Sequence, residues 1–82
     1  MYDYKAQRKE LFTENGASIL LEVRDKVHAG LKQTGAVMLG HMMVSGLSWV
    51  SIAAIDYLVE RGEIREVTGN DVTGQHRVFV KA

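Results

Sequence analysis

Three histidines and a scatter of hydroxyl and carboxylate side chains are the groups in this sequence that could do chemistry. His28, His41 and His76 do not share the spacing of metal ligands, and the chain has no cysteine to supply a thiolate or a disulfide. Serine and aspartate occur without the framing residues of a nucleophilic triad. The glycine-containing stretch "GNDVTG" precedes a predicted strand rather than a helix, so it indicates a hairpin turn and not a phosphate loop. We therefore expect no enzyme activity, no metal and no cofactor.

Composition points to one small domain without a strong overall charge. The 82 residues are 46% hydrophobic and 24% charged, which is typical of a globular protein. Ten lysines and arginines balance ten aspartates and glutamates, so any attraction to a polyanion must be local. The sequence contains no apolar run of about 20 residues, and its start, "MYDYKAQRKELF", lacks the apolar core of a signal peptide. We expect a cytoplasmic protein that does not contact membranes.

The clearest predicted helix covers residues 17–32, where an apolar stripe recurs at helical spacing: Ile19, Leu20, Val23, Val27 and Leu31. Thr13 or Asn15 could begin this helix, and Gly35 suits a left-handed cap after it. Residues 1–16 are expected to form a separate N-terminal arm. Asp3 to Phe12 could be a short helix within it or a frayed terminus.

Further helices are expected around Leu39 to Val44 and from Ser48 to Arg61. Ser48 can cap the later helix, and Gly62 can end it. The short stretch Ala36 to Leu39 could be a brief strand or the start of the helix that follows it.

The C-terminal part changes to the period of a β-hairpin. "EIREVT" and "QHRVFVKA" are rich in β-branched residues and flank the predicted turn. We expect Val78 and Val80 to face the helices, and Arg77, Phe79 and Lys81 to point away. The predicted core is Leu20, Val23, Val27, Leu39, Met43, Ile55, Leu58, Ile64, Val78 and Val80.

The stretch "AAIDYLVERGEIREV" carries a resemblance to a known superfamily. Small and aliphatic residues, a leucine, a glycine four positions later and an aliphatic residue follow in order at Ala54, Ile55, Leu58, Gly62 and Ile64. In this order, residues 17–82 resemble a winged helix-turn-helix domain. The resemblance implies an α+β fold of three helices and a C-terminal two-stranded β-hairpin wing. It also implies binding to double-stranded DNA, with the third helix in the major groove and the wing on the backbone.

Carried over by position, the resemblance assigns a DNA-facing set on the third helix: Ser48, Trp49, Ile52, Ala53 and Asp56. Phosphate contacts would come from the wing: Arg65, His76, Arg77 and Lys81. Base readout typically uses arginine, lysine, asparagine or glutamine. The third helix has no lysine or arginine before Arg61.

Two functions therefore remain open. The favoured one is a DNA-binding transcriptional regulator, expected to be a homodimer through Tyr4 and Leu11 because two domains double the phosphate contacts. The alternative is a winged-helix protein-interaction module, an adaptor or inhibitor, that uses an exposed patch of Trp49 and Ile52. If the helix is rotated by one residue from the expected facing, these two side chains belong to the core instead.

Overall fold

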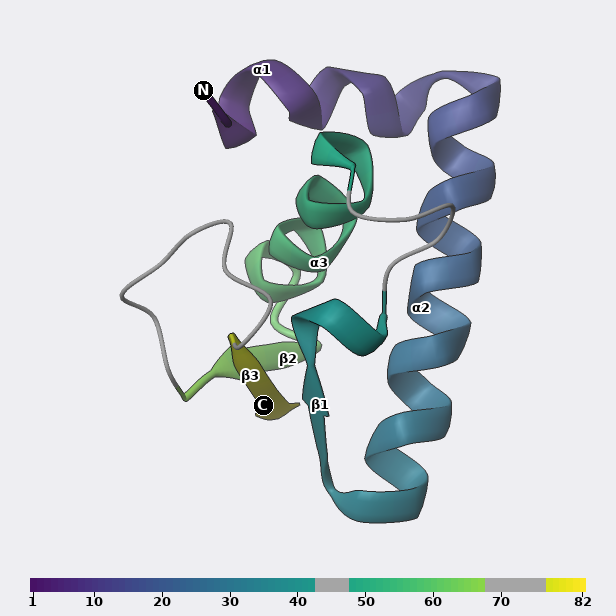
Figure 1. The fold of residues 1–82 in the computed structure, drawn as a ribbon. Helices are drawn as coiled ribbons and strands as arrows, with labels where there is room; N and C mark the ends of the chain where they lie inside the picture. Colours follow the sequence, from purple (N-terminus) through teal and green to yellow (C-terminus); the bar gives the residue numbers. More distant parts are fainter. Residues whose placement is uncertain (43–47, 68–76) are drawn as a thin grey trace.

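The computed structural model describes residues 1–42, 48–67 and 77–82, which form an α+β domain (Figure 1). A short helix α1 (Tyr4–Arg8) continues into a 3-10 turn η1 (Lys9–Phe12), and the long helix α2 (Glu14–Thr34) follows. Next come strand β1 (Ala36–Met38), a 3-10 turn η2 (Leu39–His41) and helix α3 (Trp49–Glu60). Strands β2 (Ile64–Glu66) and β3 (Val78–Lys81) complete an antiparallel sheet in the order β1-β3-β2. Within these residues, every helix is too short or too polar to cross a bilayer.

Helix α2 confirms the helix expected from its apolar stripe and extends it at both ends. The Thr13 hydroxyl accepts a hydrogen bond from the Gly16 amide, which caps the first turn. Gly35 ends the helix with φ of 80°, a left-handed conformation that glycine adopts without a steric penalty. The N-terminal arm is helical rather than frayed. The backbone of η1 at Glu10 packs closely against Gly16 of α2. A Cβ atom added at Gly16 would overlap the Glu10 carbonyl oxygen.

Helix α3 has the predicted caps. The Ser48 hydroxyl accepts from the Ser51 amide, and Gly62 follows the helix with φ of 75°. The helix packs against both α1 and α2, and its buried residues surround most of its circumference: Ser51, Ile52, Ala53, Ala54, Ile55 and Leu58. The small side chains of Ala53 and Ala54 allow neighbouring elements to approach closely.

The sheet settles the ambiguity at Ala36. This stretch is a strand, and β1 pairs with β3 so that Val37 lies opposite Phe79. Strand β2 pairs with the other edge of β3 and places Glu66 opposite Phe79. The expected two-strand pairing is therefore present within a three-stranded sheet. The helix expected around Leu39 to Val44 is only the 3-10 turn η2 in its described part. Its later part, with Met43, and the turn of the hairpin lie outside the described residues.

The predicted facing of β3 was wrong by one residue. Phe79 is fully buried, Arg77 is buried on the same face, and Val78 and Val80 are only half-buried. Burying the larger aromatic side chain removes more apolar area from water than burying either valine, which favours this register. Six other predicted core residues are buried: Val23, Val27, Leu39, Ile55, Leu58 and Ile64. Leu20 is half-buried and packs against this core.

Candidate functional site

The N-terminal residues of the chain cover the face of α3 that was expected to meet DNA. The Tyr2 hydroxyl donates a 2.6 Å hydrogen bond to Asp56 Oδ2, and the Tyr4 hydroxyl donates one of 2.7 Å to Glu60 Oε1. Asp56 and Glu60 are one helical turn apart and so share a face of α3. Helix α1 lies across α3 at this face (Figure 1).

An arginine strengthens this attachment. Arg8 donates to Glu60 from Nε at 2.9 Å and from Nη2 at 2.7 Å, which is the two-point geometry of a guanidinium–carboxylate pair. Hydrogen bonds from Arg8 and Tyr4 lower the pKa of Glu60 to about 2. Glu60 is therefore an anion at neutral pH, and it holds both side chains.

The position of Trp49 agrees with one prediction, while its neighbours contradict another. Trp49 is 45% exposed, and its ring meets the Tyr2 ring edge-on with centroids 6.4 Å apart. Ile52 and Ala53 are 1% and 0% exposed, so their expected role as surface contacts was wrong. They belong to the core against which Tyr2 and Tyr4 pack.

Arg77 is a buried residue, which contradicts the expectation that it points away from the helices on the wing. Its Nη2 lies 2.8 Å from Asp56 Oδ1 and 2.7 Å from Glu66 Oε1, and its side chain is 7% exposed. Burial lowers the pKa of Arg77, but the hydrogen-bonded carboxylates of Glu66 and Asp56 raise it on balance, so the group stays charged. The same Asp56 accepts a hydrogen bond from Tyr2. Burial is the larger cause and this hydrogen bond the second cause that raise the pKa of the Tyr2 hydroxyl. One network thus joins the N-terminus, α3, β2 and the start of β3.

The remaining predicted residues are dispersed. Ser48 caps α3, while Arg65 and Lys81 are exposed on the sheet. His76 lies outside the described residues. Leu11 was expected at a dimer contact, but its side chain is 1% exposed and fills the core of its own chain. Tyr4, the other expected dimer contact, is half-buried against Glu60.

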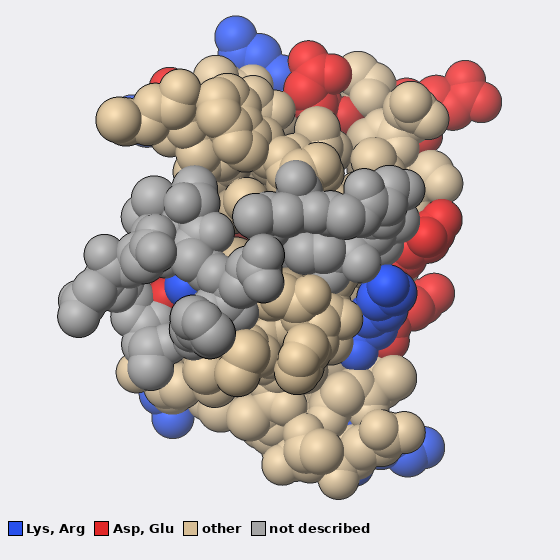
Figure 2. Space-filling model, viewed as in Figure 1, with Lys and Arg blue, Asp and Glu red and all other residues tan. Residues whose placement is uncertain are grey.

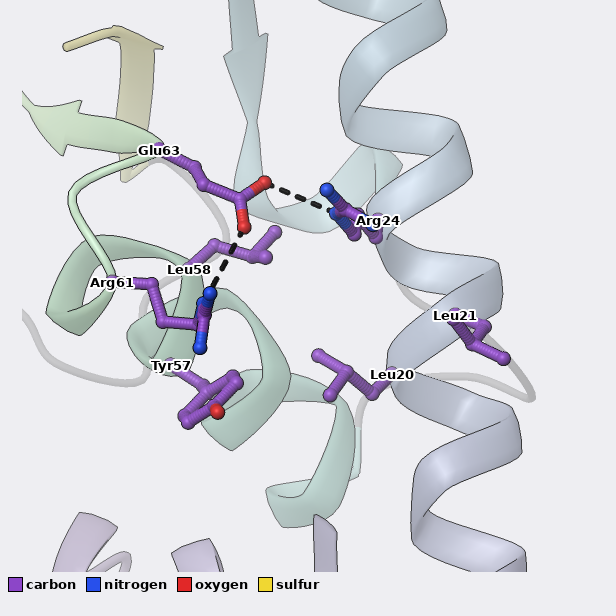
Figure 3. A pocket seen from close by; sticks show the side chains of 7 residues that line it. All are labelled: Leu20, Leu21, Arg24, Tyr57, Leu58, Arg61 and Glu63. Atoms are coloured by element: carbon purple, nitrogen blue, oxygen red, sulfur yellow. Dashed lines mark hydrogen bonds and ion pairs between the residues drawn. The ribbon is translucent and has the colours of Figure 1, made fainter.

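A groove between α2 and α3 was not anticipated from the sequence (Figure 3). Leu20, Tyr57 and Leu58 line its apolar part, and it encloses about 170 Å³. Figure 3 shows Glu63 reaching towards both Arg24 and Arg61 at one end. The adjacent leucines 20 and 21 were a usable signal, because consecutive helical residues differ in direction by about 100° and cannot both face one core. Leu21 is 59% exposed.

Electrostatic contacts bind the rim of this groove together. Arg24 Nε donates to Glu63 Oε1 at 3.0 Å, and Arg61 Nε lies 3.7 Å from Glu63 Oε2. His28 Nε2 is 3.4 Å from Glu63 Oε1. Burial would raise the pKa of Glu63, but the hydrogen bonds from Arg24 and His28 lower it on balance. Glu63 thus remains an anion shared among three basic side chains.

Tyr57, which lines the groove, contacts one aromatic ring and two arginines. Phe12 meets its ring edge-on at 5.8 Å, and the Arg8 and Arg61 guanidinium carbons lie 5.4 Å and 5.9 Å from its centroid. Phe12 itself is 60% exposed. Aromatic rings and arginines of this kind are enriched in protein–protein interfaces.

The surface seen in Figure 2 shows lysines and arginines in small separate groups rather than in one continuous stripe. Among the described residues, no group of three histidine, aspartate or glutamate side chains could enclose a metal ion. Comparisons of the chain with protein-family models, with curated proteins and with solved structures found no match.

Proposed function

We propose that this chain is a small winged-helix domain that binds another protein through the groove between α2 and α3. The order of its elements supports the winged-helix assignment: α2, β1, α3 and then the paired strands β2 and β3. The strand order β1-β3-β2, with the last strand in the middle, also fits a hairpin wing joined to a strand that follows the first domain helix.

The coverage of α3 by the N-terminal residues is the observation that favours protein binding over DNA binding. The major groove is about 12 Å wide and admits one helix. Helix α1 lies across α3, and a helix with its side chains is about 10 Å in diameter, so the pair is too thick to enter together. The acidic groups on this face, Asp56 and Glu60, would also repel phosphate. Both are already engaged with the N-terminal residues.

The groove offers what a protein partner requires. Leu21 lines the groove and Phe12 contacts the Tyr57 ring, and both are large apolar side chains that are mostly exposed. Arg24 and Arg61 add donors at the rim. Large apolar and aromatic side chains and arginines are the residue types that typically dominate the binding energy of protein–protein interfaces.

DNA binding remains a second candidate because the element order favours a winged-helix domain. In that case the N-terminal residues would have to leave α3, and exposed Arg65 and Lys81 would contact phosphate. The contacts of Tyr2, Tyr4 and Arg8 with α3 oppose this rearrangement.

Site-specific photo-crosslinking tests the proposed function. A photoreactive residue replaces Leu21 in the full chain inside cells that produce it, and the matched control carries the same group at the neighbouring exposed Glu22. We expect a protein adduct from position 21 and little from position 22. An adduct of the chain with itself would identify the partner as a second copy. Nucleic-acid adducts, or equal labelling from both positions, would contradict protein binding through this groove.

A further inference from the structure

We infer that the partner presents an acidic segment with one apolar side chain near the end that meets Leu20, and that this segment lies along α2 from Leu20 to Gly35. The inference rests on the proposed protein-binding function and specifies the chemistry of the partner. It follows from the shape, the charge and the apolar floor of one extended surface.

The extended surface consists of two hollows that meet at Glu63. The first is the groove at Leu20 and Arg24, and the second, of about 570 Å³, lies beside His28 and Leu31. Residues 20, 24, 28 and 31 follow one another at helical spacing along a single face of α2. At 1.5 Å per residue, the stretch from Leu20 to Gly35 is about 22 Å long. An extended segment of about seven residues covers this length.

The charge of this surface calls for an anionic partner. Of the described side chains that line the two hollows, the cationic ones are Arg24, Lys32, Arg61 and Lys81, and Glu63 is the one carboxylate. His28 adds positive charge when it is protonated. Each guanidinium has five N–H donors, so a single carboxylate cannot satisfy both Arg24 and Arg61. A carboxylate of the partner can add two-point hydrogen bonds to either arginine.

The apolar side chains that line the first hollow favour a hydrophobic side chain of the partner. The hollow of about 170 Å³ has Leu20, Tyr57 and Leu58 on its apolar side and Arg24, Arg61 and Glu63 on its charged side. A cavity of about 150 Å³ accommodates benzene. One leucine or phenylalanine side chain therefore fits. A nucleic-acid duplex would supply negative charge, but its bases are stacked inside and could not fill this floor, so an acidic peptide matches the surface better.

Three synthetic peptides test this inference on the isotope-labelled full chain by amide chemical shifts. The first is acidic with one leucine near an end, the second replaces that leucine with alanine, and the third replaces the glutamates of the first with glutamines. We expect the first to shift the amides of Leu20, Arg24 and Glu63. The alanine peptide should bind at least tenfold more weakly, because it loses most of the apolar surface that the leucine side chain buries. The glutamine peptide should also bind more weakly.

Charge variants of the protein give the matched control. Arg24→Gln and Arg61→Gln should each weaken the acidic peptide about tenfold, whereas Arg65→Gln removes an exposed cation outside the groove and should leave the affinity unchanged. Circular dichroism of each variant establishes that it is folded.

Two kinds of result would overturn the inference. One is the absence of groove shifts with the acidic leucine peptide, or equal affinity for the uncharged one. The other is stronger shifts of the same amides by a single-stranded oligonucleotide. If position 21 still crosslinks to a protein while the acidic peptide fails, the proposed function stands and the partner is not acidic.

Discussion

The Tyr2 hydroxyl lies 2.6 Å from Asp56, a residue 54 positions later in the chain, and donates a hydrogen bond to it. Asp56 also binds Arg77, so the first residues of the chain and the start of the last strand meet on the same carboxylate of α3. This arrangement covers Asp56 on the helix face that a DNA-reading domain would leave open. The surface that we propose for a partner lies between α3 and α2.

Arg77→Ala should destabilise the fold strongly. The change leaves Asp56 and Glu66 facing one another without the cation that both now bind, and breaking a buried pair typically costs about 3–5 kcal/mol. Arg65→Ala, on the exposed side of the sheet, should change the free energy of unfolding by less than about 0.5 kcal/mol. Urea denaturation of both variants makes the comparison. Equal small effects would mean that Arg77 is a surface residue, as the sequence first indicated.

Acid should loosen the N-terminal residues through Glu60. Its pKa is lowered from an ordinary 4.5 to about 2, so the stabilisation from Arg8 and Tyr4 is present above pH 4.5 and is lost as pH falls through about 2. The single tryptophan, Trp49, touches Tyr2, so its fluorescence reports the attachment. Glu60→Gln should remove this part of the pH dependence, and Glu22→Gln should keep it. An identical acid transition in both variants would rule out Glu60 as its origin.

Gly16→Ala should destabilise the chain although alanine is the better helix former. Helix propensity alone favours the substitution by about 1 kcal/mol. The new methyl group would overlap the Glu10 carbonyl, and such overpacking costs about 1–3 kcal/mol. Exposed Ser18→Ala on the same helix is the control and should not destabilise. A higher melting temperature for Gly16→Ala would show that η1 does not pack against α2 as described.

The facing of β3 is tested by two truncations of neighbouring residues. Phe79→Ala should cost about 3–5 kcal/mol because Phe79 is fully buried. Val80→Ala removes a half-buried side chain and should cost clearly less. Chemical denaturation measures both, and the reverse ranking would restore the register expected from the sequence.

Local signals in the sequence predicted α2, α3 and their ends well, whereas the helix expected around Leu39 to Val44 is a 3-10 turn in its described part. Thr13, Ser48, Gly35 and Gly62 act within one turn of their own positions, so neighbouring residues suffice to recognise them. The facing of β3 could not be read in this way. A strand that alternates between valines and a phenylalanine has an apolar side in either register, and only the space left by the helices decides between them.

The coverage of α3 by the N-terminal residues also could not be predicted from the sequence. It depends on contacts such as Tyr4–Glu60, which join residues 56 positions apart, and nothing near either residue indicates the pairing. The expectation that Ile52 and Ala53 would be exposed failed because it treated α3 as uncovered. The groove at Leu20 and Tyr57 depends likewise on how α2 and α3 cross.

A titration of the full chain with a pool of mixed-sequence DNA duplexes at low salt, followed by amide chemical shifts, tests the central claim most directly. The claim is that the N-terminal residues close the outer face of α3, so that this domain does not read DNA. We predict that the amides of Trp49 and Asp56 keep their shifts throughout the titration. Saturable shifts of both amides, together with loss of the Tyr2–Trp49 ring contact, would contradict the account, because α3 would then have opened to bind the duplex.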